Sequence, residues 1–293
     1  MRIISVDSTL VYRGMDIGAA KPGVDVLERY PHELVNIRDP AESYSAAGFQ
    51  ADADTLVRET LAQGKIPLLV GGSMLYFKAF QYGLADLPEA APEIRSALTQ
   101  QAQSEGWKSL HRELDRVDPR AARKIHPNNI QRLQRALEVY RATGKPISWW
   151  WEQQPVSRPE QRYEADYRQF VLSGVDRVEL HRRIETRFMA MLESGFEAEV
   201  SSLRARPDLT LDLPSMRAVG YRQIWQHQTG ETGRQEMIRQ AIAATRQLAK
   251  RQSTWLNNWP GLEGISASDP DPAATILKKL QQAPIVEDRT GVD

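Results

Sequence analysis

Residues 3–22 read IISVDSTLVYRGMDIGAAKP, and this stretch decides the fold that we predict for the chain. It begins with apolar, mostly β-branched residues, which are typical of a short buried strand. Asp7 and Ser8 follow at the carboxyl end of that strand, where open α/β sheets bind their ligands. Two glycines and a Lys-Pro pair then predict a loop that can wrap around a substrate. Position alone favours a simpler alternative, in which Asp7 and Ser8 cap a following helix, because capping acids are common.

A second buried strand is predicted at residues 65–70, directly before the turn formed by residues 71–73. A helical pattern over residues 43–64 connects the two predicted strands. This order favours an α/β fold with a parallel sheet, and residues 167–172 read as another strand of that sheet. The turn leads into a helix whose first backbone N–H groups are free. Together with the Ser73 hydroxyl, they form a predicted anion site.

The composition is that of a globular protein, with 41% apolar and 26% charged residues among 293. No window approaches the roughly 20 apolar residues of a membrane span, and the N-terminus lacks the pattern of a signal peptide. The chain contains no cysteine, which excludes disulfides, zinc–thiolate sites and thiol nucleophiles. We therefore expect a cytoplasmic protein that does not associate with membranes.

Changes of pattern along the chain predict two domains. Residues 1–88 and 167–260 form the predicted α/β core, and residues 89–166 form an inserted, mainly helical domain. Residues 261–293 are predicted to be a mobile tail. Three consecutive tryptophans, Trp149 to Trp151, lie near the end of the insertion. Packing between the two domains is favoured for them over stacking on nucleic-acid bases.

The basic residues are unevenly distributed, although Lys and Arg (38) balance Asp and Glu (38) over the whole chain. Residues 120–145 contain seven basic residues against one acid, and residues 217–251 contain seven against two. Two basic segments on a neutral chain are expected of a protein with a localised polyanion site. Charge alone supports equally the alternative that these are ordinary solvated helix faces.

Several segments together resemble the bacterial tRNA dimethylallyltransferases. Besides the opening stretch, they are IPLLVGGSMLYFK at residues 66–78, QRLQR at 131–135, RAVGYR at 217–222 and TRQLAKRQSTW at 245–255. The resemblance extends from Ile3 to about Trp259 and implies a P-loop-NTPase-like parallel sheet flanked by helices. The family begins with a strand, a P-loop of the form G-x-x-x-x-G-K-[ST] and a helix, none of which occurs in these 293 residues.

The resemblance implies transfer of a dimethylallyl group from dimethylallyl diphosphate to the exocyclic amine of the adenosine next to the anticodon. Such an amine is a poor nucleophile, and a carboxylate that accepts its proton can act as a general base. Asp7 and Ser73 are the predicted catalytic residues, and Arg187 and Lys21 the predicted diphosphate contacts. Mg²⁺ is the expected cofactor, bound mainly through the diphosphate. The family usually has threonine where Ser73 stands, so the hydroxyl is kept.

The predicted partners are the tRNA anticodon loop and dimethylallyl diphosphate, and we expect a monomer. The target base must be splayed out of the loop to reach the acid. The predicted tRNA-binding residues lie in the matched motifs, at one further matching position and on a basic helix face. They are Asp7, Ser8, Thr9, Leu10, Ser73, Arg95, Gln131, Arg132, Leu133, Gln134, Arg135, Arg217, Ala218, Val219, Gly220, Tyr221, Arg222, Arg246 and Lys250.

Alternatives of different class remain open. One is a working tRNA prenyltransferase whose P-loop is encoded upstream of Met1, and the other is a truncated chain that binds RNA without catalysis. A prenyltransferase acting on free adenine nucleotides is a third, against which the second basic segment speaks. As written, the sheet lacks the central strand of the family. We therefore expect an exposed apolar strand edge, poor solubility or partial unfolding, weak RNA binding at most and no prenyl transfer.

Overall fold

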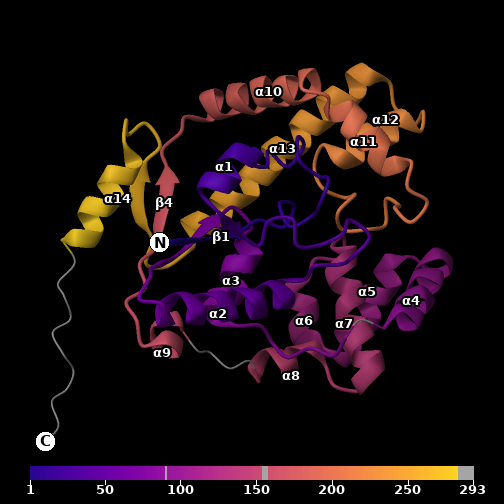
Figure 1. The fold of residues 1–293 in the computed structure, drawn as a ribbon. Coiled ribbons are helices and arrows are strands. Elements are labelled where there is room, and N and C mark those ends of the chain that lie inside the picture. The colour runs from indigo at the N-terminus through magenta and orange to yellow at the C-terminus, as the bar shows by residue number, and fades with distance from the viewer. Residues whose placement is uncertain (90, 154–157, 283–293) are drawn as a thin grey trace, which may run out of the picture. The chain divides into compact units, whose positions relative to one another are not determined.

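The computed structural model describes residues 1–89, 91–153 and 158–282. The chain divides into two compact units, of which the first comprises Met1–Phe77 and Tyr163–Asp293 and the second Lys78–Arg162. The boundary falls within helix α3 (Met74–Tyr82), not at residue 88. Figure 1 shows the order of helices and strands along the chain.

The first unit contains a parallel sheet, as the sequence predicts. Strand β1 (Arg2–Val6) lies between β2 (His32–Glu33) and β3 (Pro67–Gly71) and pairs with both in parallel. Helix α1 (Val24–Arg29) precedes β2. The predicted connecting helix is α2 (Ala46–Ala62), which begins where the Ser45 side chain accepts a hydrogen bond from the Gly48 N–H at 3.0 Å.

Strand β3 is more exposed than the sequence predicts. Ile66, Leu68 and Val70 are 56%, 39% and 51% exposed, so the prediction of a buried strand is wrong at this position. The physical reason is that β3 pairs only with β1 among the described strands and therefore forms an edge.

The predicted strand at residues 167–172 forms, but in a separate sheet. Strand β4 (Phe170–Ser173) pairs in parallel with β5 (Glu263–Ser266), and not with the sheet around β1. Helix α14 (Pro272–Gln281) follows, and its Lys279 pairs with Glu263 at 3.4 Å. The structure thus differs from the prediction of a mobile tail as far as residue 281. Residues 283–293 lie outside the described residues.

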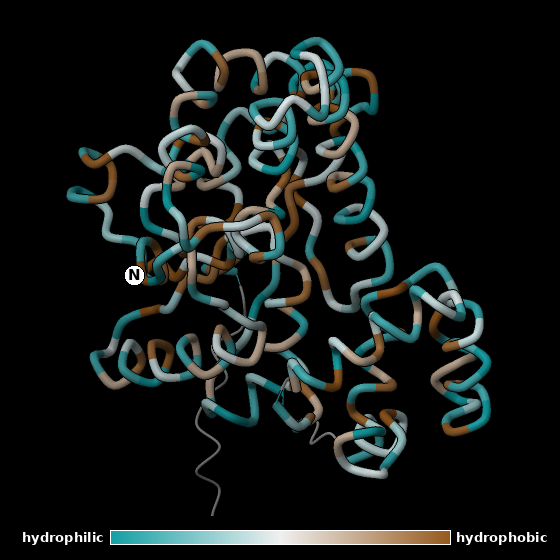
Figure 2. The backbone as a smooth tube through the Cα atoms, turned by 90° about the vertical axis from the view of Figure 1, so that its right-hand side faces the viewer, coloured by the Kyte–Doolittle hydropathy of each residue, from teal (hydrophilic) through white to brown (hydrophobic). Residues whose placement is uncertain are grey.

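Four helices complete the first unit: α10 (Arg177–Glu193), α11 (Phe196–Arg204), α12 (Tyr221–Gln228) and α13 (Arg234–Asn257). Helix α13 packs against both α10 and α12. Asp176 caps the start of α10, because its side chain accepts a hydrogen bond from the Val178 N–H at 2.8 Å. Figure 2 shows that short apolar and polar stretches alternate along the backbone. No helix in the described part of the chain is long and apolar enough to cross a membrane.

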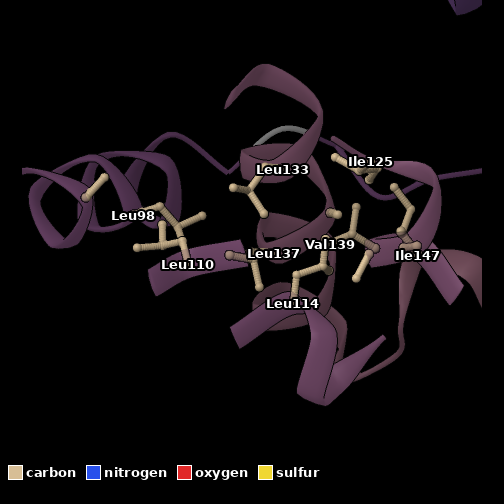
Figure 3. Packing of buried hydrophobic residues seen from close by; sticks show 12 residues of the cluster. Leu98, Leu110, Leu114, Ile125, Leu133, Leu137, Val139 and Ile147 are labelled. Carbon is tan, nitrogen blue, oxygen red and sulfur yellow. The ribbon is translucent and has the colours of Figure 1, made fainter. Parts of the chain in front are cut away.

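The second unit is helical, as predicted. It contains most of α3, followed by α4 (Pro92–Glu105), α5 (Trp107–Val117), α6 (Pro119–Lys124), α7 (Ile130–Thr143), α8 (Ile147–Glu152) and most of α9 (Pro159–Tyr163). Leucine and isoleucine side chains of these helices form one buried cluster, shown in Figure 3. Trp150 and Trp151 pack against this cluster within their own unit. The Lys145 ammonium lies 3.8 Å from the ring centroid of Trp149.

Candidate active site

Two turns meet at the edge of the sheet where β1 and β3 end. Because the strands are parallel and Val6 is in register with Gly71, the residues that follow them lie side by side. The Ser73 N–H donates to the Val6 carbonyl oxygen at 3.1 Å, and the Ser8 N–H donates to Ser73 Oγ at 2.9 Å. The Ser73 hydroxyl also donates to Ser8 Oγ at 3.2 Å. Backbone hydrogen bonds therefore hold Ser73 next to the Asp7–Ser8 turn.

The two carboxylate oxygens of Asp7 have different surroundings. Oδ1 accepts hydrogen bonds from the N–H groups of Thr9 at 2.7 Å and Leu10 at 3.2 Å. The capping alternative is therefore right in part, although Asp7 caps a turn and no helix begins there. Among the residues that the structure describes, none donates a hydrogen bond to Oδ2. One oxygen fixes the backbone, and the other is available to accept a proton.

Tyr76 is the buried neighbour of this carboxylate. Burial, the neighbouring Tyr12 and the negative charge of Asp7 all raise the pKa of the Tyr76 phenol. The phenol donates a hydrogen bond to the Tyr44 carbonyl oxygen at 3.2 Å. Tyr76 is therefore a neutral, structural member of the site at physiological pH.

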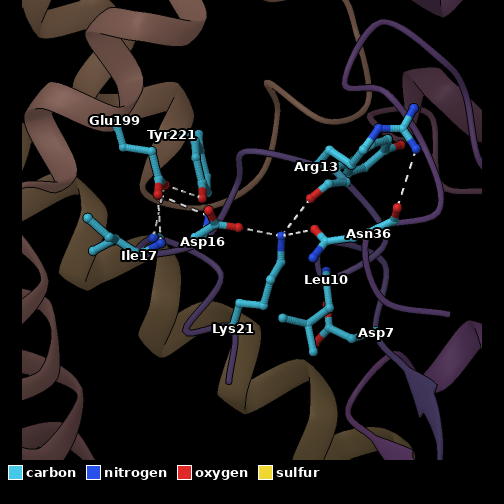
Figure 4. A network of polar contacts seen from close by, with 11 residues as sticks. Asp7, Leu10, Arg13, Asp16, Ile17, Lys21, Asn36, Glu199 and Tyr221 are labelled. Carbon is cyan, nitrogen blue, oxygen red and sulfur yellow. Dashed lines mark hydrogen bonds and ion pairs between the residues drawn. The ribbon is translucent and has the colours of Figure 1, made fainter. Parts of the chain in front are cut away.

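Lys21 is committed to the loop that follows Asp7. Its Nζ donates to the Tyr12 carbonyl oxygen at 2.7 Å, to Asp16 Oδ1 at 2.5 Å and to Asn36 Oδ1 at 2.6 Å (Figure 4). The side chain is only 4% exposed. An ammonium group has three protons to donate, and all three are used here. Lys21 therefore holds the loop in this structure, and its contact with the diphosphate stays a prediction.

Glu199 on α11 holds the same loop from the other side. Its carboxylate accepts hydrogen bonds from three consecutive backbone N–H groups, those of residues 16–18, at 3.0, 2.7 and 3.2 Å. The Tyr221 hydroxyl donates to the same carboxylate at 2.6 Å (Figure 4). Burial and the Glu199 charge raise the pKa of Tyr221, which is 1% exposed. The ring and hydroxyl of Tyr221 are both enclosed, so its side chain presents almost no surface to tRNA.

The cations predicted on α10 and α13 differ in how far they are neutralised. Arg246 donates to Glu185 at 3.2 Å. Arg187 and Lys250 are exposed, and neither has an ion pair within the described ranges. Both remain available to bind phosphate groups.

The RAVGYR motif contributes exposed arginines around a buried turn. Arg217 pairs with Asp212 at 3.2 Å, whereas the Arg222 side chain is exposed and has no hydrogen bond or ion pair to the described residues. Ala218 and Val219 are half-buried. Gly220 has a φ of +90°, and a Cβ there would lie 2.8 Å from the ring of Phe196, so both backbone and packing require glycine.

In the helical unit, a buried carboxylate engages two of the predicted tRNA contacts. Glu138 is fully buried, pairs with Arg95 at 3.0 Å and Arg135 at 3.2 Å, and accepts a hydrogen bond from the Ala91 N–H at 2.7 Å. Burial raises the pKa of Glu138, but hydrogen bonds from Arg95, Ala91 and Arg135 outweigh it and lower the pKa. Arg135 also donates to the Pro88 carbonyl oxygen at 2.5 Å. Both arginines therefore stabilise the segment that leads into α4.

The other residues of the QRLQR motif differ in exposure. Leu133 is fully buried in the cluster of Figure 3, so its side chain presents no surface to tRNA. Gln134 donates to the Arg95 carbonyl oxygen at 3.1 Å and to Thr99 Oγ1 at 3.0 Å. Gln131 and Arg132 are exposed, and their side chains have no hydrogen-bond partner in the part of the chain that the structure describes.

Comparisons with known proteins identify the family. The profile of the IPP transferase family matches residues 10–259. The chain belongs to this family. It is 51% identical over 290 residues to tRNA dimethylallyltransferase 2 of Hahella chejuensis. The aligned region covers 96% of this chain and 87% of that protein.

Solved structures agree with this assignment. The full-length tRNA isopentenylpyrophosphate transferase of Bacillus halodurans matches with a TM-score of 0.65 and 34% identity, over 96% of this chain and 86% of that one. A eukaryotic dimethylallyltransferase acting on tRNA matches with a TM-score of 0.75 over 95% of this chain and 71% of that one. Its identity is 23%, so it supports the fold alone.

For this member of the IPP transferase family, the structure brings Asp7, Ser8 and Ser73 together. It also reveals a residue that the sequence analysis did not single out. Gln252 on α13 donates from Nε2 to the Gly72 carbonyl oxygen at 3.0 Å. Its only sequence signal is its place in the matched RQSTW segment, which does not show what it contacts.

Proposed function

We propose that this chain transfers the dimethylallyl group of dimethylallyl diphosphate to the exocyclic amine of the adenosine next to the anticodon in tRNA. The observation that carries the proposal is the free Oδ2 of Asp7 beside the Ser73 hydroxyl, at the edge where two parallel strands end. Membership of the IPP transferase family and the name of the Hahella relative support it.

Asp7 is the proposed general base. As the amine nitrogen bonds to the dimethylallyl carbon, the bond from that carbon to the diphosphate oxygen breaks, and the diphosphate leaves with the bonding electrons. The amine gains positive charge, and Asp7 Oδ2 accepts one of its protons. The hydrogen bonds from Thr9 and Leu10 to Oδ1 hold the carboxylate in one orientation, so that Oδ2 is presented to the amine.

Ser73 and Arg187 are the proposed contacts of the leaving diphosphate. The Ser73 hydroxyl donates to Ser8 Oγ here, and rotation about its Cβ–Oγ bond redirects this proton toward an anion. The Arg187 guanidinium is exposed and has no ion pair among the described residues. Donors and cations that meet the charge as it develops on the leaving group lower the barrier.

Mg²⁺ fits the site if it arrives with the diphosphate. The edge offers hard oxygen donors, namely the hydroxyls of Ser8 and Ser73, which leave Asp7 Oδ2 free to accept the proton. The described residues contain no group of three or more His, Cys, Asp or Glu side chains that could hold a metal ion. Mg²⁺ commonly keeps several waters and binds through one or two carboxylates and substrate phosphates. When bound, it would supply positive charge to the leaving diphosphate.

The proposed tRNA contacts are the exposed cations and amides that lack partners. These contacts are Gln131 and Arg132 in the helical unit. In the first unit they are Arg222 and Lys250. Gln can hydrogen-bond a splayed base, while Arg and Lys bind phosphates. We place the reaction in the cytoplasm and expect a monomer to carry it out.

The test is an assay of the 293-residue chain with tRNA, labelled dimethylallyl diphosphate and Mg²⁺, with AMP as an alternative acceptor. Transfer to tRNA but not to AMP supports the proposal. A second candidate, RNA binding without catalysis, is supported by the exposed side chains of Arg132, Arg222 and Lys250, which have no ion pair among the described residues. Salt-sensitive tRNA binding without transfer would support this second candidate and contradict the first.

A further inference from the structure

The peptide bond between Gly72 and Ser73 is held from both sides. Its N–H group donates to the Val6 carbonyl oxygen at 3.1 Å, which connects it to β1. Its carbonyl oxygen, that of Gly72, accepts the hydrogen bond from Gln252 Nε2 at 3.0 Å, which connects it to α13. Gln252 is half-buried, and it lies 180 residues after Gly72 in the chain.

The contact between Gln252 and the turn is so close that a side chain at residue 72 would displace the Gln252 amide. A Cβ atom added to Gly72 would lie 2.5 Å from Gln252 Nε2. Likewise, a Cβ on Gly71 would lie 2.1 Å from the Val6 carbonyl oxygen. These two glycines therefore let the turn approach β1 on one side and the Gln252 amide on the other.

We propose that Gln252 is a positioning residue, which orients the Ser73 hydroxyl next to Asp7. This inference rests on the proposed function, in which Ser73 contacts the leaving diphosphate. Serine lacks the β-methyl group that restricts the first side-chain torsion of threonine, so its hydroxyl direction depends more on its backbone. The hydroxyl is held by the Ser8 N–H at 2.9 Å, and this bond requires the Gly72–Ser73 peptide to keep its orientation.

The amide of Gln252 suits this role because it is a neutral donor. A carboxylate of the same shape would face the Gly72 carbonyl oxygen without a proton to donate, and like partial charges would push the turn away. A protonated carboxyl group would donate again. The exchange of Gln252 for glutamate is therefore a pH-dependent probe of this one hydrogen bond.

The first test compares Gln252→Met with Gln247→Ala. Methionine keeps the length of the side chain but cannot donate a hydrogen bond. Gln247 is exposed on the same helix, and its side chain has no hydrogen bond to the described residues. We expect Gln252→Met to lower kcat about 10–100-fold with an unchanged KM for tRNA, because small misplacements of reacting groups are costly. Amide hydrogen exchange at Ser73 should become faster. The control should change neither quantity.

The second test uses Gln252→Glu across pH 5 to 8. Its kcat relative to that of the unaltered chain should rise as the pH falls, since the protonated carboxyl donates to Gly72. Unchanged kcat and unchanged Ser73 exchange in Gln252→Met would overturn the inference, as would a flat ratio in Gln252→Glu. If the unaltered chain transfers no prenyl group, the proposed function fails separately. Ser73 exchange and the affinity for pyrophosphate then decide whether Gln252 positions the turn.

Discussion

The loop of residues 10–22 and the sheet edge at Asp7 and Ser73 contain similar chemical groups, but these differ in whether their hydrogen-bonding capacity is used. In the loop, the Lys21 ammonium uses all three protons, and the Glu199 carboxylate accepts four hydrogen bonds. At the edge, one oxygen of Asp7 has no donor among the described residues. The charged groups of the loop stabilise the fold, whereas the edge keeps a group free for chemistry. Residue type alone does not distinguish the two.

Replacing Asp7 tests the free side of this comparison and should have the largest effect. Asp7→Asn keeps an oxygen for the Thr9 and Leu10 N–H groups but cannot accept a proton from the amine. Turnover should fall about 10²–10⁴-fold, the usual range for a general base. Single-turnover transfer and tRNA affinity are the measurements. A tenfold loss of tRNA affinity with normal chemistry would mean that Asp7 only holds the turn.

Glu138 extends the comparison to the helical unit, because it is a fully buried carboxylate with partners for both oxygens. Glu138→Ala should lower the free energy of unfolding by about 3 kcal/mol, because it leaves the Ala91 N–H and two arginines without their acceptor. Urea unfolding measures the effect. Glu152→Ala, which breaks an exposed pair with Arg120, is the matched control and should cost less than about 1 kcal/mol. Equal losses would contradict the structural role.

Replacing Glu199 tests the part of the comparison in which the charged group has hydrogen-bond partners within the first unit. Glu199→Ala leaves the N–H groups of residues 16–18 and the buried Tyr221 hydroxyl without an acceptor. We expect a loss of about 2 kcal/mol in the free energy of unfolding, since unsatisfied buried groups are costly. Turnover per folded molecule should fall much less than in Asp7→Asn. A larger fall in turnover than in stability would place Glu199 in the chemistry and break the distinction.

The same distinction between free and paired groups predicts how the cations of α13 respond to salt. Lys250 is exposed without a partner in the described part of the chain, whereas Arg239 pairs with Glu236. Lys250→Ala should reduce the slope of log tRNA affinity against log salt by about one unit. Arg239→Ala should change the slope less. Arg246 pairs with Glu185, so the change of slope in Arg246→Ala should lie between those of the other two variants. An unchanged slope in Lys250→Ala would show that this helix face does not contact phosphate.

The smallest effect should come from the exposed ion pairs around Arg206. Hydrogen bonds from Arg206 and the Ala41 N–H lower the pKa of Asp39 to about 2. A lowered folded-state pKa contributes stability that is present above the unfolded value of about 3.9 and is lost as the pH falls toward 2. The free energy of unfolding should therefore decline over this window. Arg206→Ala should flatten the decline, and an equally steep decline in that variant would contradict the assignment.

Local sequence patterns were sufficient for most of the elements. The strand at β1, the cap of α2 at Ser45 and the helices of the second unit follow from periodicity and capping, which depend on neighbouring residues. The meeting of Asp7 and Ser73 was also predictable, because parallel strands end at the same edge. The exposure of β3 and the separate pairing of β4 with β5 were not, since they depend on which strands become neighbours.

The sequence by itself determined the fold class, the family motifs and the two residues at the sheet edge. Only the tertiary structure decided which of the motif residues are free to bind a ligand. Tyr221 is enclosed by Glu199, 22 residues away, and Arg95 is paired with Glu138, 43 residues away. Gln252 reaches Gly72 across 180 residues. The physical reason is that a hydrogen bond is satisfied by whatever group the fold brings within reach, and a sequence motif does not specify that partner.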